Sequence, residues 1–206
     1  MGKLSDSLKL LEKNEFIVPR YGIARTINDA FSIADEIGYP VVLKINSDSH
    51  KTDFGGVVTN IQNAVHLKKV WEDFMEKTKK LPIVFEDYIV QKQISGVEFI
   101  LGAKEDPVFG KVIMVGSGGI LAEILNDVSF RAVPIDAKDA ESMISEIKAS
   151  QLLSGFRGKK FIRDIKLIET LIKLSVFVQK NDFAEMDMNP VIINNDNAWV
   201  VDARMR

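Results

Sequence analysis

The chain contains no cysteine among its 206 residues. This absence excludes a disulfide framework, a thiolate zinc site and a cysteine nucleophile. Histidine is also scarce, with only two residues, His50 and His66. Any chemistry that needs an imidazole must therefore be carried by one of these two side chains.

Long apolar runs and blocks of basic residues are also missing. No window approaches the roughly 18 apolar residues of a membrane-spanning helix, and the N-terminal MGKLSDSLKLLEKNEF has no apolar stretch of signal-peptide length. The 29 acidic and 27 basic residues give a formal net charge of −2, whereas nucleic-acid-binding proteins usually carry a basic face. We expect a soluble, cytoplasmic protein with no nucleic-acid partner and no membrane partner.

The apolar pattern predicts an α+β fold with hairpins and no strict βαβ alternation. A capping box at Thr26 and Asp29 begins one helix, which Gly38 ends. Further helices are expected at 5–14, 64–78, 137–149 and 165–180. Strands are expected at 41–45, 57–61, 96–104, 109–115 and about 129–134, with an extended stretch at 83–94 and a last pair of strands near the C-terminus. The order indicates one domain of two lobes, 17–91 and 92–206, with a ligand-binding crevice between them.

The C-terminal pair of strands predicts a cluster of hard oxygen atoms. If the turn at 194–197 closes symmetrically, Asn189 lies opposite Asp202 and Asp187 lies opposite Arg204. Residues directly opposite have Cβ atoms about 4.5–5.5 Å apart. An amide oxygen beside a carboxylate suits Mg²⁺, which completes its shell with phosphate and water. A solvated polar face on an exposed hairpin is the alternative interpretation.

The other face of this hairpin is expected to form a single core stripe. Its members are Met186, Met188, Ile192, Trp199, Val201, Ala203 and Met205.

Lys44 lies inside the apolar strand 41–45. A lysine in a central strand is costly unless its ammonium group reaches water or an anion, so the alternatives are an edge strand or a bound phosphate. Gly55 and Gly56 follow a polar loop, and paired glycines allow backbone N–H groups to approach an anion closely. We therefore interpret Lys44, Gly55 and Gly56 as a phosphate-binding cradle.

The two histidines differ in their surroundings. His66 lies in an amphipathic helix and is interpreted as a surface or packing residue. His50 lies in a loop of Ser, Asp, Lys and Thr beside the predicted cradle. It is either a solvated loop residue or a nucleophile toward phosphorus, because a neutral imidazole can carry a phosphoryl group near pH 7.

A second glycine-rich segment, Gly116–Gly119, is expected to form a flexible loop near the crevice. Charged residues follow it at Glu123, Asp127 and Arg131. Their spacing alone assigns them no role.

Several motifs in the same order resemble the ATP-grasp subunit of ADP-forming acyl-CoA (acetyl-CoA) synthetases, which are relatives of succinyl-CoA synthetase. The resemblance extends from about Leu10 to Arg204. The motifs that carry it are VPRYGIA (18–24), AFSIADEIGYPVVLKI (30–45), HKTDFGGV (50–57), GVEFILGAKEDPVFGKVIMVGSGGI (96–120), DVSFRAVPI (127–135), LLSGFRG (152–158), AEMDMNPV (184–191) and VVDAR (200–204). It implies an ATP-grasp fold with ATP or ADP bound between two lobes.

The resemblance also implies roles for single residues. Lys44 matches the lysine that contacts the nucleotide phosphates, and Glu98 matches a glutamate near the ribose. Asn189 and Asp202 match the Mg²⁺ ligands, in agreement with the pairing argued above. Asp187 is placed to hold the imidazole of the catalytic histidine or to balance its charge.

His50 matches a loop histidine that distinguishes these enzymes from succinyl-CoA synthetase. In the family it accepts a phosphoryl group from a phosphohistidine of the partner subunit and delivers it to ADP. A separate CoA-binding α subunit is implied, in a hetero-oligomer that we expect to be a heterotetramer. The overall reaction is acyl-CoA + ADP + phosphate ⇌ carboxylic acid + CoA + ATP.

The sequence departs from the family pattern at two places. The segment between Lys44 and His50 is about two residues shorter and lacks a proline. The hinge usually reads Val-Gln-Glu, whereas this chain has Val90-Gln91-Lys92. Lysine cannot accept a hydrogen bond, so we expect backbone groups at Val90 and Lys92 to contribute to nucleotide recognition.

The sequence leaves two other functions open. In a succinyl-CoA-synthetase-like subunit, or another ATP-grasp ligase, His50 would be incidental. In a nucleotide-sensing subunit, the nucleotide would bind without phosphoryl transfer.

Overall fold

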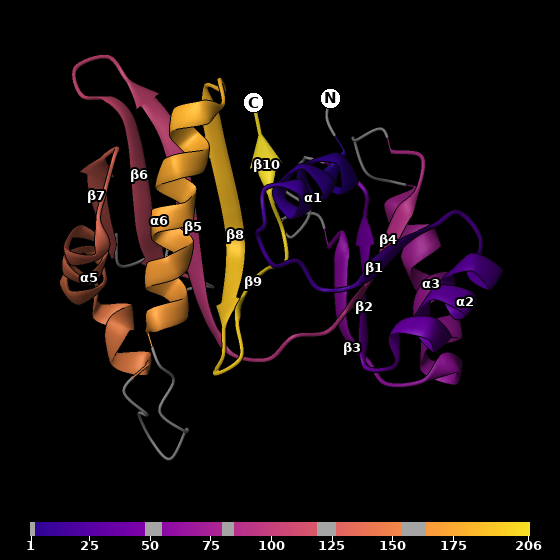
Figure 1. The fold of residues 1–206 in the computed structure, drawn as a ribbon. Helices are drawn as coiled ribbons and strands as arrows, with labels where there is room; N and C mark the ends of the chain where they lie inside the picture. Colours follow the sequence, from indigo (N-terminus) through magenta and orange to yellow (C-terminus); the bar gives the residue numbers. More distant parts are fainter. Residues whose placement is uncertain (1–2, 48–54, 80–84, 119–126, 154–163) are drawn as a thin grey trace. The chain divides into compact units, whose positions relative to one another are not determined.

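The computed structural model describes residues 3–47, 55–79, 85–118, 127–153 and 164–206. The chain forms two compact units (Figure 1): unit 1 comprises Met1–Ser7 and Pro19–Ile94, and unit 2 comprises Leu8–Val18 and Ser95–Arg206. Each unit combines a β-sheet with helices, which confirms the predicted α+β class. The predicted lobes left the N-terminal residues unassigned, whereas helix α1 (Leu4–Lys13) contributes residues to both units.

Unit 1 contains a four-stranded antiparallel sheet in the order β1-β4-β2-β3. The strands are β1 (Tyr21–Ala24), β2 (Val41–Ile45), β3 (Val57–Ile61) and β4 (Tyr88–Lys92). Helices α2 (Ile27–Ile37) and α3 (Ala64–Thr78) pack on this sheet. The order makes β2 and β4 the two inner strands.

The N-terminus of α2 is fixed by the predicted capping box. The backbone N–H of Asp29 donates to Thr26 Oγ1 at 3.2 Å, and the backbone N–H of Thr26 donates to Asp29 Oδ2 at 2.9 Å. These bonds satisfy N–H groups that the helix itself leaves unpaired. The helix ends at Gly38, as predicted.

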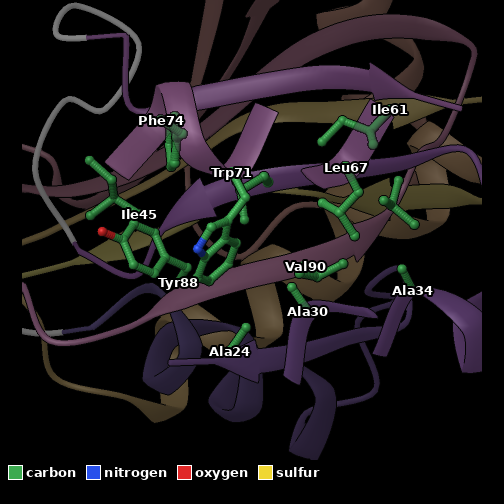
Figure 2. Packing of buried hydrophobic residues seen from close by; sticks show 12 residues of the cluster. Ala24, Ala30, Ala34, Ile45, Ile61, Leu67, Trp71, Phe74, Tyr88 and Val90 are labelled. Atoms are coloured by element: carbon green, nitrogen blue, oxygen red, sulfur yellow. The ribbon is translucent and has the colours of Figure 1, made fainter. Parts of the chain in front are cut away.

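An apolar core joins the sheet of unit 1 to its two helices (Figure 2). The ring centroid of Tyr88 of β4 lies 5.2 Å from that of Trp71 and 5.8 Å from that of Phe74. Both partners lie on α3, one turn apart, so helical spacing places both rings on the sheet. This core keeps β2, the strand of Lys44, in the interior of the unit.

Unit 2 contains a larger antiparallel sheet in the order β10-β8-β5-β6-β7, and β9 pairs with β8. Its strands are β5 (Val97–Asp106), β6 (Gly110–Ser117), β7 (Val128–Ala132), β8 (Glu185–Ile193), β9 (Ala198–Val200) and β10 (Arg204–Met205). Helices α5 (Ala137–Glu146) and α6 (Ile165–Lys180) pack on it (Figure 1).

A β-bulge in β8 divides the predicted core stripe between the two faces of the sheet. Met188 pairs with Leu101 of β5, but the next pair joins Val191 to Phe99, so two residues of β8 stand against one of β5. The extra residue reverses the alternation of side chains. Beyond the bulge, Val191 therefore continues the face of Met188, while Ile192 and Trp199 of the predicted stripe share the opposite face with Glu98. Most members of the stripe are nevertheless buried, and Ile192 is one of them.

Two other segments differ from their predicted structure. Helix α5 ends at Glu146 rather than at residue 149, and a short 3₁₀-helix follows at Lys148–Leu152. The carboxylate of Asp127 accepts the backbone N–H groups of Lys148 and Ala149, which gives this short helix its own N-terminal acceptor. Gly116 and Ser117, predicted in a loop, are the last residues of β6.

No helix in the described part of the chain is long and apolar enough to cross a membrane.

Candidate functional site

Lys44 occupies an inner strand of unit 1. It pairs with Val57 of β3 on one side and with Ile89 of β4 on the other, and it is only 5% exposed. The edge-strand alternative for this lysine is therefore wrong. A buried ammonium group is stable only beside acceptors or an anion, which is the property expected of a phosphate-binding lysine.

The glycine pair lies at the start of β3, the strand next to Lys44. Gly55 has a φ of 67°, a left-handed conformation that favours glycine. Gly56 is buried, and its carbonyl accepts the N–H of Ile45 at 3.0 Å. The backbone conformation thus favours glycine at position 55, and Gly56 extends the pairing of β2 with β3. Contact of either residue with phosphate stays a prediction.

The predicted hinge residues have structural partners in unit 1. Val90 is buried in the core of Figure 2. Lys92 Nζ donates to the carbonyls of Gly38 at 2.8 Å and Tyr39 at 3.0 Å, which follow the end of α2. A lysine in this place complements the carbonyl end of a helix. Sequence reasoning missed this contact, because residues 38 and 92 are brought together only by the fold.

The register of the C-terminal strands is confirmed. Arg204 pairs with Asp187, and Trp199 pairs with Ile192. Between these pairs, the backbone N–H of Asn189 donates to the carbonyl of Asp202 at 3.2 Å. The predicted opposition of Asn189 and Asp202 therefore holds, although neither belongs to a regular ladder pair.

The bulge of β8 includes Asn189, which is solvent-exposed, whereas Asp202 is buried. Bulges commonly occur beside active sites, where they redirect a side chain. An amide oxygen and a carboxylate from opposed segments fit Mg²⁺, which takes one or two protein ligands when it also binds phosphate. Within the described residues, no group of three or more His, Cys, Asp or Glu side chains is placed to hold a metal ion.

Glu98 shares a sheet face with Asp187. Glu98 lies opposite Ile192, Asp187 lies opposite Gly102, and these positions fall on the same side of β5. Glu98 is exposed and its carbonyl accepts the N–H of Gly118 at 3.0 Å. A Cβ on Gly118 would lie 2.6 Å from the carbonyl carbon of Glu98, so only glycine fits there. Unit 2 thus brings Glu98, Asp187 and the Asn189–Asp202 pair to one region of its sheet.

The charged residues after Gly116 have structural roles where they are described. Ser117 Oγ donates to Asp127 Oδ2, and the carboxylate also accepts N–H groups of Lys148 at 2.7 Å and Ala149 at 2.9 Å. Burial opposes ionisation of Asp127, but these hydrogen bonds lower its pKa. Arg131 forms an ion pair with Glu146. Glu123 lies outside the described residues.

Only one of the two histidines lies in the described part of the chain. His66 is exposed on α3, and its Nδ1 accepts the backbone N–H of Gln62 at 3.4 Å, in accord with the predicted surface role. His50, the predicted phosphoryl carrier, lies outside the described residues.

The fold and the family match define a class: the chain matches the ATP-grasp domain family over residues 3–206, so it is an ATP-grasp protein. It is 42% identical over 197 residues to the β subunit of the ADP-forming acetate–CoA ligase II of Pyrococcus furiosus, covering 91% of this chain and 84% of that subunit. The chain belongs to this family of ADP-forming acetate–CoA ligase β subunits.

A longer relative is the ADP-forming acetate–CoA ligase I of Archaeoglobus fulgidus, which is 39% identical over 206 residues. The match covers 98% of this chain but 30% of that ligase. The chain therefore corresponds to most of a subunit in one organism and to a minor part of a single longer chain in another.

Solved structures agree with the fold. An acetyl-coenzyme A synthetase of Ca. Korarchaeum cryptofilum, in complex with coenzyme A and Ca-AMPCP, has a TM-score of 0.92 at 37% identity, covering 98% of this chain and 91% of that one. Its complex with coenzyme A and Mg-AMPPCP has a TM-score of 0.81 at 36% identity, covering 98% and 90%. That structure is described with its phosphohistidine segment pointing towards the nucleotide-binding site.

Proposed function

We propose that this chain is the nucleotide-binding subunit of an ADP-forming acyl-CoA synthetase, which converts acyl-CoA, ADP and phosphate to carboxylic acid, CoA and ATP. The observation that carries the proposal is the opposition of Asn189 and Asp202 at a bulge, on the sheet that also presents Asp187 and Glu98. Relatives matched over most of their length are β subunits of such ligases. The proposed cellular location is the cytoplasm.

Each predicted site residue has its own role in phosphoryl transfer. Lys44 neutralises negative charge on the phosphates of ADP, where positioning and electrostatic stabilisation supply most of the catalysis. Gly55 and Gly56 give the backbone close access to these phosphates, Glu98 binds the ribose, and the hinge at 90–92 lies along the base. Asn189 and Asp202 hold Mg²⁺, which when bound neutralises charge on the phosphate oxygens.

His50 carries the phosphoryl group. Its imidazole nitrogen attacks the phosphorus of a phosphohistidine on the partner subunit, so one N–P bond forms as the other breaks. An oxygen of the terminal phosphate of ADP then attacks the same phosphorus, which forms ATP and frees the imidazole. Asp187 orients this imidazole or balances its charge.

A CoA-binding α subunit supplies the first phosphohistidine and the acyl-phosphate chemistry. The β-subunit names of the relatives support such a partner. We propose a hetero-oligomer of the two subunits, with a heterotetramer as the expected assembly.

Labelling from [γ-³²P]ATP tests the proposal directly. Incubation of the purified chain with Mg·ATP runs the last step in reverse and is expected to place an acid-labile label on His50. The His50→Ala variant should lose the label, and the matched His66→Ala variant should keep it, because His66 is an exposed residue of α3.

Two outcomes would contradict the proposal. Full turnover by His50→Ala together with its α subunit would favour a ligase without the histidine relay. Binding of Mg·ADP in calorimetry, without phosphoryl transfer in the reconstituted complex, would favour a nucleotide sensor.

A further inference from the structure

Gly118 lies where the end of β6 meets the backbone of Glu98 on β5. The regular pairing of these strands ends at Phe99 and Ser117, and the N–H of Gly118 adds one more hydrogen bond, to the Glu98 carbonyl at 3.0 Å. A Cβ at position 118 would lie 2.6 Å from the carbonyl carbon of Glu98, 2.7 Å from its carbonyl oxygen and 2.8 Å from its Cβ. Any other residue at 118 would therefore have to displace one of the two strands.

The close contact, and not the backbone conformation, is what requires glycine at this position. Gly55 and Gly110 have positive φ angles, whereas Gly118 does not. Its backbone could therefore accept a side chain if Glu98 were not in the way.

The end of β6 is held in place on the side away from Glu98. The N–H of Ser117 donates to the Asp127 carbonyl at 3.0 Å, and Ser117 Oγ donates to the Asp127 carboxylate. That carboxylate also accepts the N–H groups of Lys148 at 2.7 Å and Ala149 at 2.9 Å. Ser117 and Asp127 are both 6% exposed, so a shift of β6 would break buried hydrogen bonds. A Cβ at 118 is therefore expected to displace Glu98 rather than β6.

Glu98 lies on a strand that has neighbours on both sides, since β5 runs between β8 and β6 (Figure 1). Ile192 of β8 lies opposite Glu98, and Gly118 contacts it from the other side. The side chain of Glu98 is exposed, on the sheet face that also presents Asp187. The position of this exposed carboxylate follows from where the two neighbouring strands hold its backbone.

We propose that Gly118, held by Ser117 and Asp127, positions Glu98 for the ribose of ADP. This inference rests on the proposed function, which assigns Glu98 to the ribose. Gly118 lets the Glu98 backbone lie directly against the end of β6, and from there the carboxylate accepts hydrogen bonds from the ribose hydroxyl groups. Because such bonds need donor–acceptor distances close to 3 Å, a displacement of about 1 Å removes them.

The affinity for a nucleotide without ribose hydroxyl groups tests the proposal. Calorimetry on the full chain gives the Kd of Mg·ADP and of Mg·2′,3′-dideoxy-ADP. The wild type should prefer Mg·ADP by about 10- to 100-fold, the effect of a hydrogen bond to a charged group. Gly118→Ala should reduce this preference to about threefold or less, because it weakens binding of Mg·ADP and leaves the Kd of the dideoxy analogue unchanged.

Gly102→Ala is the matched control on the strand of Glu98. Its Cβ would lie 3.3 Å from Met114 Cγ and 3.3 Å from the Met186 carbonyl oxygen, so it crowds β6 and β8 without touching Glu98. This variant should keep the wild-type ribose preference. Circular dichroism measures the folded fraction of each variant.

Two further variants test the same arrangement without added bulk. Ser117→Ala removes the side-chain bond to Asp127 and should lower the ribose preference by about threefold. Glu98→Ala should abolish the preference, and Gly118→Ala should have no further effect on it when combined with Glu98→Ala, because both act through the same carboxylate.

A wild-type ribose preference in folded Gly118→Ala would overturn the role of Gly118. If that variant does not fold, a wild-type preference in Ser117→Ala would overturn it instead. An equal loss in Gly102→Ala would also contradict the inference. A wild-type preference in Glu98→Ala would remove Glu98 from the ribose site and so refute that part of the proposed function, which makes the two failures distinguishable.

Discussion

Asn189 and Asp202 are the proposed Mg²⁺ ligands, and they lie on opposed segments where the sheet is irregular. In a regular strand, the alternation of side chains would give each residue a fixed face. The bulge in β8 breaks this alternation, so that an exposed amide stands opposite a buried carboxylate. The hydrogen bond between the Asn189 N–H and the Asp202 carbonyl holds the two backbones together.

This arrangement predicts the effect of removing one ligand. Asn189→Ala should raise the Mg²⁺ concentration needed for half-maximal turnover by about tenfold or more, the size typical of lost support at a metal site. Titration of the labelling reaction with MgCl₂ measures the shift. Asn195→Ala removes an exposed amide in the turn of the same hairpin and should leave the titration curve in place. An unchanged Mg²⁺ requirement in Asn189→Ala would remove this residue from the metal site.

Among the elements, β7 and α5 are joined by a compact ionic network. Glu146 accepts from both guanidinium nitrogens of Arg131 and from the hydroxyl groups of Ser129 and Ser142. The hydrogen bond from Arg131 is the largest cause that lowers the pKa of Glu146, to about 2 from 4.5. The network ties the outer strand of the unit 2 sheet to the helix that covers it.

The direction of that pKa shift gives a pH dependence. A lowered pKa in the folded state means stabilisation that is complete above about pH 4.5 and is lost as the pH falls toward 2. Because the Glu146 side chain is 43% exposed, solvent screening reduces the contribution to about 1 kcal/mol. Glu146→Gln should therefore lower the free energy of unfolding by about this amount at pH 7.

Urea denaturation at a series of pH values measures the difference, which should shrink below pH 4.5 and vanish near pH 2. Glu141→Gln changes an exposed carboxylate of the same helix and serves as the control. A constant difference between Glu146→Gln and wild type across this range would contradict the ionic interpretation.

Elements governed by local signals could be predicted from the sequence. The capping box of α2, the strand of Lys44 and the register of the C-terminal hairpin follow from spacing within a short stretch of chain. The bulge of β8 could not, because it depends on how β5 pairs with it. Lys92 and Asn46 escaped prediction for the same reason: each supplies a hydrogen bond to a helix end about 40 to 55 residues away.

At the scale of the whole molecule, the chain is an ATP-grasp domain, and its relatives carry the matching region on chains of different length. It covers most of a separate β subunit in Pyrococcus furiosus and less than a third of one longer ligase in Archaeoglobus fulgidus. In the proposed function, the site residues of this chain bind the nucleotide and transfer the phosphoryl group, and the steps on CoA and the acyl group belong to the α subunit.

The proposed division between the two subunits predicts that nucleotide binding and phosphoryl transfer can be measured separately from CoA release. The purified chain alone should bind Mg·ADP in calorimetry and accept label from ATP, but it should show no ADP-dependent release of CoA from acetyl-CoA. Addition of the α subunit should restore that release, because in the proposed mechanism the partner's phosphohistidine supplies the phosphoryl group that His50 passes to ADP. The His50→Ala variant with the same α subunit controls for binding without transfer, since it should assemble but remain inactive. CoA release by the chain alone would show that the division between subunits is wrong, because catalysis of the acyl step would then lie within this chain.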